Sequence, residues 1–189
     1  MDGKKRCDWG SHDNPLFVKY HDEEWGVPVR DDRMLFEFLL LEGFQAGLRW
    51  ITILKKRDNF RQSFDNFDAK KIARYDEKKI EELMENSGIV RNRRKIEAAV
   101  VNGDAFLEVQ KEFGSFSDYI WSFVNGKPVV NKRKRMGEIP ANTELSDEIS
   151  KDLKNRGFKF VGSTIIYAYM QATGMVNDHT VDCFRYVEV

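Results

Sequence analysis

Two cysteines and two histidines near the ends of the chain have the residue types of a metal site. Cys7 and His21 lie near the N-terminus, and His179 and Cys183 lie near the C-terminus, four residues apart. That spacing places two side chains on one face of a helical turn. Two thiolates and two imidazoles are the ligands of a closed, structural zinc site without an open position for catalysis. Two unrelated buried thiols and two ordinary histidines are the alternative, and we expect the third histidine, His12, at the surface.

Glu42 places a charged side chain at an apolar helical position. Residues 31–41 are predicted to form a helix whose buried face includes Phe38 and Leu39, and Glu42 follows both at helical spacing. A buried carboxylate must be hydrogen-bonded, paired or protonated, because an unpartnered one costs several kcal/mol. The alternative is that the helix ends at Glu42, before Gly43, and that the side chain turns to water.

Aromatic residues are concentrated around Glu42 in the first part of the chain. They are Trp9, Phe17, Tyr20, Trp25, Phe44 and Trp50. Aromatic faces beside one buried carboxylate suit a flat, nitrogen-rich ligand that stacks and donates hydrogen bonds, and a purine is such a ligand. For any single ring, packing in the core is the simpler interpretation.

Basic residues cluster locally, although 31 Lys and Arg balance 31 Asp and Glu. A formal net charge of zero excludes a polyanion-binding protein that works by bulk charge, so nucleic-acid contacts must come from local clusters. Residues 91–95 follow the glycine-bearing segment 88–90 at a predicted helix start, where backbone N–H groups and the helix dipole favour phosphate. The run 132–135 is either a second positive patch or only a flexible loop.

Helices must position these residues, because alternating strand patterns are scarce. Start and stop signals predict helices over 15–24, 31–41, 45–57, 68–74, 76–86, 91–112, 115–123, 143–156 and 163–174. Residues 125–142 form the one long irregular stretch. The 189 residues, 41% of them hydrophobic, can bury one core. We therefore predict a compact, all-α, single-domain fold.

The N-terminal residues and the longest uncharged run indicate in which cellular compartment the protein is expected. No apolar region follows the N-terminal residues, which argues against a secretory signal peptide. The longest uncharged run, residues 160–177, is too polar to span a membrane. We expect a cytoplasmic protein with reduced cysteines and no membrane partner.

Several blocks of the sequence together resemble the bacterial 3-methyladenine DNA glycosylase I family. The blocks are residues 7–9, 20–28, 41–50, 88–96, 121–123, 156–162 and 177–179, and they spread over nearly the whole chain. The resemblance implies a helix-hairpin-helix glycosylase fold over residues 1–189, with segments 1–30 and 174–189 forming a zinc-binding annex. It implies one structural Zn²⁺ per chain, bound by Cys7, His21, His179 and Cys183.

The same resemblance implies roles for the other candidate residues. Glu42 contacts the methylated adenine, Tyr20 adds a polar contact, and Trp50 stacks on the base. The residues implied to line or support the pocket are Trp9, Trp25 and Phe17. Those implied to contact DNA are the hairpin residues Gly88, Ile89 and Val90, the adjacent Arg91 and Arg94, and the plug residues Gly47 and Leu48.

The implied activity is that of a monofunctional DNA repair glycosylase. It acts as a monomer on alkylated double-stranded DNA, flips out 3-methyladenine, hydrolyses its N-glycosidic bond and leaves an abasic site and the free base. The aspartate base of many related glycosylases is implied to be missing, so no general base is assigned.

Two departures from the family pattern leave the base preference open, including 3-methylguanine. Arg49 stands where serine is usual, and Phe17 stands where tyrosine is frequent. The alternatives are a glycosylase with altered base preference and a non-catalytic, zinc-containing module that binds damaged DNA.

Overall fold

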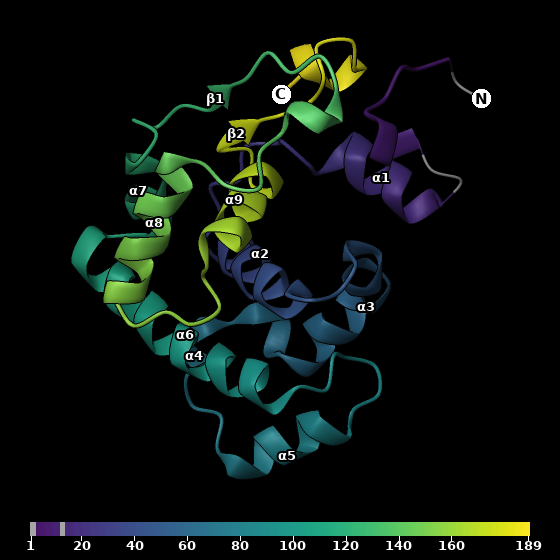
Figure 1. Cartoon of the computed structure of the whole chain (residues 1–189). Helices are drawn as coiled ribbons and strands as arrows, with labels where there is room; N and C mark the ends of the chain where they lie inside the picture. The colour runs from purple at the N-terminus through teal and green to yellow at the C-terminus, as the bar shows by residue number, and fades with distance from the viewer. Residues whose placement is uncertain (1–2, 12–13) are drawn as a thin grey trace.

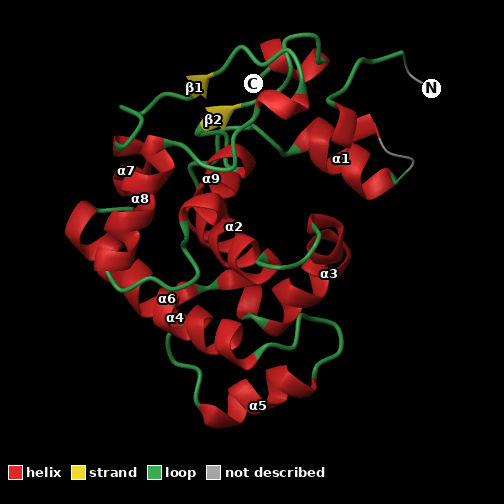
Figure 2. Cartoon of the chain, in the orientation of Figure 1, coloured by secondary structure: helices red, strands yellow, loops and turns green. Residues whose placement is uncertain are grey.

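The computed structural model describes residues 3–11 and 14–189, so the prediction for His12 lies outside the described residues. The chain is built from helices, which confirms the predicted all-α class (Figures 1 and 2). The α-helices are α1 (Pro15–Glu23), α2 (Asp32–Gln45), α3 (Trp50–Ser63), α4 (Ala69–Ile72), α5 (Glu77–Glu85), α6 (Arg93–Phe113), α7 (Phe116–Ser122), α8 (Glu144–Asn155) and α9 (Ser163–Ala172). Shorter elements are the 3₁₀ helices η1 (Asp8–Ser11), η2 (Asp65–Phe67), η3 (Met136–Glu138) and η4 (Phe184–Val187), and the strands β1 (Val129–Val130) and β2 (Val176–Asn177).

Side-chain caps fix most of the helix starts. A cap accepts a hydrogen bond from a backbone N–H that has no partner inside the helix, which stabilises that first turn. The capping residues are Asn14, Asp31, Asp68, Asp76, Asn92, Ser115 and Thr143. Because these signals are local, the predicted starts of these helices agree with the structure to within about two residues.

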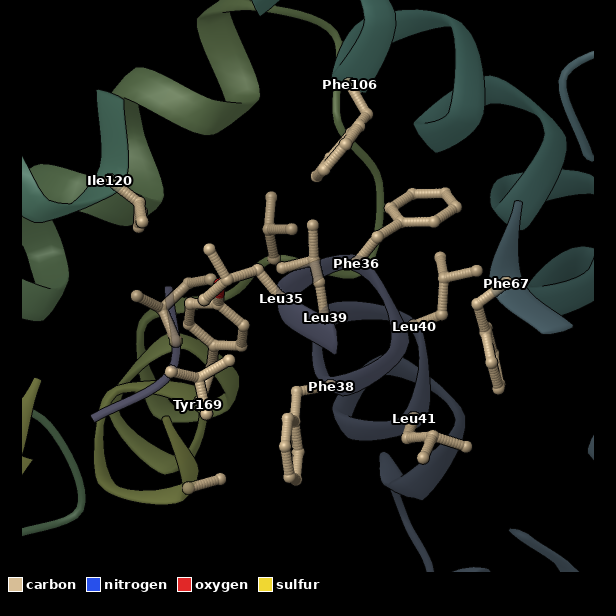
Figure 3. Close-up of a cluster of buried hydrophobic side chains, with 14 of the residues drawn as sticks. Leu35, Phe36, Phe38, Leu39, Leu40, Leu41, Phe67, Phe106, Ile120 and Tyr169 are labelled. Atoms are coloured by element: carbon tan, nitrogen blue, oxygen red, sulfur yellow. The ribbon is translucent and has the colours of Figure 1, made fainter. Parts of the chain in front are cut away.

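Helix α2 forms the centre of the core. Every residue from Leu35 to Phe44 is buried, and α2 packs against α3, α6, α7 and α9. Figure 3 shows its leucines and phenylalanines surrounded by Tyr169 of α9, Ile120 of α7 and Phe106 of α6. A helix whose residues are buried on every side must be covered by other elements. The other helices therefore arrange themselves around α2.

The predicted boundary between the second and third helices is wrong. α2 continues through Gly43 to Gln45, and α3 begins only at Trp50. Phe160 packs closely over Gly43, where a Cβ would lie only 3.3 Å from the Phe160 Cβ, so the close packing favours glycine at this helical position. Glu42 thus lies in the last turn of a packed helix and is 3% exposed, so the expectation of a frayed, water-facing Glu42 is excluded.

Lys95 of α6 holds the C-terminal end of α2. Its Nζ donates hydrogen bonds to the carbonyl oxygens of Phe44 at 2.8 Å and Ala46 at 2.6 Å. A cation stabilises the negative end of a helix dipole, and burial lowers the pKa of the Lys95 ammonium. The sequence analysis grouped Lys95 with a phosphate-binding cluster, and this is wrong because its charge is used inside the protein.

Lys95→Met is expected to lower the free energy of unfolding by about 1.5–3 kcal/mol, the range typical of hydrogen bonds to charged groups. Methionine retains the buried stem but removes the donor that the two carbonyl groups share. Urea denaturation measures the change. Lys111→Met is the control, because Lys111 is exposed on the same helix and pairs only with exposed Glu108. Equal midpoints for the two variants would contradict this account of Lys95.

Residues 125–142 are mostly irregular, as predicted, but they include β1 and η3. β1 pairs in parallel with β2, and Arg133 forms an isolated bridge with Thr180. This pairing fastens the irregular stretch to the C-terminal segment, at the top of Figure 1. Within the described ranges, no helix is both long enough and apolar enough to cross a membrane.

Candidate ligand pocket and metal site

A cavity of about 330 Å³ lies between α1, α2, α3, α9 and η3. Its volume is at the small end of the range for ligand sites. The lining residues are Trp9, Phe17, Tyr20, Trp25, Glu42, Gln45, Trp50, Met136, Ile139, Ala168 and Gln171. Glu42 and five of the six aromatic residues from the sequence analysis therefore share one cavity. The sixth, Phe44, packs in the core against Phe60 and Phe64.

The aromatic rings of the cavity contact one another at defined angles. Tyr20 and Trp50 have ring centroids 5.4 Å apart, and Trp9 meets Trp25 edge-on at 4.9 Å. The Trp50 indole N–H is buried and has no hydrogen-bond partner in the described part of the chain. Burial raises the pKa of Tyr20 well above its ordinary value, so its hydroxyl stays neutral. The cavity thus combines stacking faces with polar groups.

Glu42 is the only acidic group among the residues that line the cavity. Burial raises the pKa of its carboxyl to about 8. No hydrogen bond or ion pair joins it to another residue of the described ranges, so its oxygens are available to a ligand. The Glu42 carboxyl and the Trp50 N–H together offer an acceptor and a donor beside aromatic walls, which is the chemistry that recognises a heteroaromatic base.

The sequence analysis missed five of the lining residues. Gln45 follows Glu42 by three positions on α2, so it could have been found had the helix been extended past Gly43. The other four come from η3, from the residue that follows it and from α9, which lie far from Glu42 in the sequence and carry no local signal of a pocket. They are Met136, Ile139, Ala168 and Gln171.

Three of the four predicted metal ligands lie together in the terminal segments. The ligand atoms of Cys7, His21 and Cys183 are buried and all within 4.8 Å of one another. The Nε2 atom of His21 is 3.5 Å from the Cys183 Sγ, and its Nδ1–H donates to Asp22 at 2.8 Å. A carboxylate on the second nitrogen orients a ligating histidine and makes it more basic.

His179 lies beside this cluster. Its ring centroid is 5.2 Å from that of His21, and its Nδ1 is 3.0 Å from the Asn177 Oδ1. Its Nε2 is buried without a hydrogen-bond partner in the described ranges, and burial lowers the pKa of the ring to about 3, so the imidazole is neutral. An unpartnered imidazole nitrogen beside two thiols and a second imidazole fits a zinc ligand set.

Glycine and a turn, not a helix, create this arrangement. Gly26 has a φ of +81°, and a Cβ there would lie 2.7 Å from the His179 ring. Residues 179–183 form an isolated bridge followed by a turn, so the predicted helical spacing of His179 and Cys183 is wrong. The turn is held by the Cys183 N–H, which donates to the Thr180 carbonyl at 2.8 Å, and by the Val181 N–H, which donates to the Arg133 carbonyl at 2.8 Å.

Residues 86–92 link α5 to α6 and carry the predicted phosphate seat. The Gly88 N–H donates to the Asn86 side chain at 2.8 Å, and Ile89 is 2% exposed. Arg93 is not free for phosphate, because it forms ion pairs with Glu77, Glu81 and Glu97.

Two arginines of this segment remain open to solvent. Arg91 and Arg94 are exposed and form no ion pair with another described residue. A second exposed turn joins α2 to α3, where Gly47 has a φ of +79° and Leu48 is 42% exposed. The sequence analysis predicted both segments to touch the same partner.

Comparison with known proteins gives consistent matches over almost the whole chain. Residues 9–186 match the methyladenine glycosylase family. A curated relative, DNA-3-methyladenine glycosylase 1 of Escherichia coli (strain K12), is 51% identical over 182 residues, covering 96% of this chain and 97% of the relative. The crystal structure of a 3-methyladenine DNA glycosylase I superposes with a TM-score of 0.92 at 50% identity, covering 95% of this chain and 98% of that one.

A further solved structure holds a ligand. It is a tyrosine-to-phenylalanine variant of 3-methyladenine DNA glycosylase I in complex with 3-methyladenine. It superposes with a TM-score of 0.92 at 36% identity and covers 95% of this chain and 96% of its own.

Proposed function

Because this chain belongs to the methyladenine glycosylase family, we propose that it excises 3-methyladenine from alkylated DNA. The reaction is hydrolysis of the N-glycosidic bond, which releases the free base and leaves an abasic site. The observation that carries the proposal is Glu42, which is buried in an aromatic cavity of about 330 Å³ and forms no hydrogen bond or ion pair with another described residue. A module that read only phosphates would have no use for such a pocket.

The cavity suits a cationic purine. Methylation at N3 leaves the adenine positively charged while it is attached to the sugar. A carboxylate attracts that charge and accepts hydrogen bonds from the amino edge of the base, and an opposite charge favours the ionised form of Glu42. Trp50 and Tyr20 supply the neighbouring aromatic faces. The favourable interaction of Glu42 therefore develops when the damaged base enters.

The chemical step needs little help from the protein, because a cationic base is already a good leaving group. The enzyme must extrude the nucleotide from the duplex, which costs a few kcal/mol, and hold the base while water attacks the anomeric carbon. We assign no general base.

We also propose that Cys7, His21, His179 and Cys183 bind one structural zinc ion. The two thiols and two imidazoles would fill its coordination sphere, so the ion would supply no chemistry to the reaction. It would join the N-terminal segment 1–30 to the C-terminal segment 174–189, as an annex to a single domain. The buried Nε2 of His179, which has no hydrogen-bond partner in the part of the chain that the structure describes, supports this ligand set.

The segment 86–92 is proposed to be a hairpin between two helices that holds DNA phosphate, as in the helix-hairpin-helix glycosylases. Exposed Arg91 and Arg94 support this role. Exposed Leu48, beside Gly47 in the turn between α2 and α3, is proposed to fill the gap that the extruded base leaves. A monomeric state and a cytoplasmic location stay predictions from the sequence.

Neutralising Arg91 or Arg94 is expected to weaken binding to damaged and undamaged duplex about equally, because phosphate contacts carry no base information. The slope of log affinity against log salt concentration should fall by about one for each phosphate-binding side chain that is neutralised. Titrations of Arg91→Gln and Arg94→Gln at several salt concentrations measure both quantities. Arg30→Gln, an exposed cation near α7, is the control. An effect confined to damaged DNA would place these arginines in the base pocket instead.

Release of the base tests the proposed activity. Purified protein is incubated with methylated duplex DNA, and the released purines are separated by chromatography. We expect 3-methyladenine in the free fraction. Binding of methylated DNA without any purine release over hours would make the chain a non-catalytic damage-binding module. Release of 3-methylguanine as well would show a broader base preference. Arg49 and Phe17, which depart from the family pattern, would then be the first residues to substitute.

A further inference from the structure

The 3₁₀ helix η3 places a run of basic residues beside the cavity. Met136 and Ile139 line the cavity, and the run 132–135 directly precedes them in the chain. Neither α1, α2, α3 nor α9 contributes to this run. The basic run therefore sits at an edge of the cavity that the pocket helices do not form.

Hydrogen bonds fix the run relative to the pocket. The Asn131 N–H donates to the Asn177 carbonyl at 3.1 Å, and the Val181 N–H donates to the Arg133 carbonyl at 2.8 Å. Within the run, the Lys134 N–H donates to the Glu138 carboxylate at 2.9 Å. Residues 132–135 are thus held by hydrogen bonds on both sides, which does not match the alternative that they form only a flexible loop.

Side chains of the run divide into one that is paired inward and three that face solvent. Arg133 turns to Asp178, whose side chain is fully buried, at 3.3 Å. Lys132 and Lys134 are exposed, and neither forms a side-chain hydrogen bond or ion pair with another described residue. The Arg135 side chain is 81% exposed, and its only ion pair within the described ranges is with Glu138, three residues away. An exposed ion pair of this kind contributes at most about 1 kcal/mol. Arg135 can therefore leave Glu138 and bind another anion at little cost.

We propose that Lys132, Lys134 and Arg135 bind backbone phosphates of the DNA strand whose extruded base occupies the cavity. This inference rests on the proposed function. A base can enter the cavity only if its own sugar and phosphates come to the cavity edge, and the edge at η3 carries exposed, ordered positive charge. Charge complementarity therefore identifies the occupant as a phosphodiester backbone. This surface is distinct in sequence from Arg91, in segment 86–92, and from Arg94, in the first turn of α6.

The test compares two triple variants that each remove three positive charges. One is Lys132→Ala/Lys134→Ala/Arg135→Ala. The control, Lys70→Ala/Lys111→Ala/Lys151→Ala, removes exposed lysines of α4, α6 and α8 that do not line the cavity. The probe is a short duplex with one stable abasic-site analogue, titrated at several salt concentrations. Free 3-methyladenine binding and thermal melting are measured on the same preparations.

For the first variant we expect the slope of log affinity against log salt to fall by roughly two to three, at about 0.9 for each phosphate that is no longer neutralised. Its melting temperature and its affinity for free 3-methyladenine should match those of the unchanged protein, and the control should keep the full slope. Equal slopes for both variants would overturn the proposal. It would also be overturned if the first variant failed to bind free 3-methyladenine, because the run would then be needed to maintain the structure of the cavity. Absence of base release by the unchanged protein would instead overturn the proposed function and leave the slope comparison to decide this surface.

Discussion

Glu42→Gln is expected to weaken the binding of free 3-methyladenine by roughly 10- to 200-fold. The substitution keeps the volume of the side chain but removes its charge and replaces one acceptor with a donor. A good bidentate contact to a base is worth about 1–3 kcal/mol, and the cavity offers no second carboxylate to replace it. Excision should fall less, because the alkylated base departs readily once it is extruded. Ligand titration and single-turnover excision on one preparation measure the two effects.

The control for this variant is Glu85→Gln, which makes the same chemical change at an exposed position on α5. Metal content and affinity for undamaged DNA should stay the same in both variants, because Glu42 is proposed to serve neither. Unaltered base binding in a folded Glu42→Gln protein would mean that the carboxyl is structural and that the pocket lies elsewhere.

The same substitution is expected to stabilise the empty protein, increasingly so as the pH rises. Burial raises the pKa of Glu42 from 4.5 to about 8, so the folded state binds a proton that the unfolded state releases. The contribution of Glu42 to the free energy of unfolding is therefore fully present below about pH 4.5. It declines by about 1.4 kcal/mol per pH unit as the pH rises toward 8. Glutamine has no proton to lose. Urea denaturation at pH 5 and at pH 8 should show a larger advantage of Glu42→Gln at the higher pH, and a constant difference would contradict the buried, unpaired state of Glu42.

Loss of the proposed zinc ion is the second large effect that we expect. Purified protein should contain about one zinc per chain, and Cys183→Ala should lose the metal and several kcal/mol of stability, because the binding energy of a structural metal contributes directly to folding. The ligands come from both ends of the chain, so the metal would join two segments that are distant in the sequence. Elemental analysis and thermal melting, with and without a chelator, measure the change.

A suitable control is Val187→Ala, since Val187 is 84% exposed in the same terminal segment. Its metal content and melting temperature should equal those of the unchanged protein. The base pocket should survive in Cys183→Ala at low temperature, as shown by binding of free 3-methyladenine, because Cys183 does not line the cavity. Metal-free protein with an unchanged melting temperature would contradict the zinc proposal.

Helix starts could be predicted because a cap and the N–H groups that it satisfies are neighbours in the sequence. Asp31, Asp76 and Ser115 are examples, each accepting from a backbone N–H three residues on. The end of α2 could not be predicted in this way. Gly43 is a poor helix former by itself, yet α2 continues through it, and the close packing of Phe160, from a distant segment, favours a residue without a side chain there.

The sequence by itself determined which residue types could recognise a purine or bind zinc, because type and helical periodicity are local properties. It also placed Glu42 on the apolar face of its helix. Only the tertiary structure decided that Met136 and Ile139 close the cavity. It also separated the basic residues, since Lys95 is buried against carbonyl groups up to 51 residues away, whereas Arg91 remains exposed. The physical reason is that burial and hydrogen-bond partners depend on segments distant in the chain, and these determine whether a charge stabilises the fold or is available to a ligand.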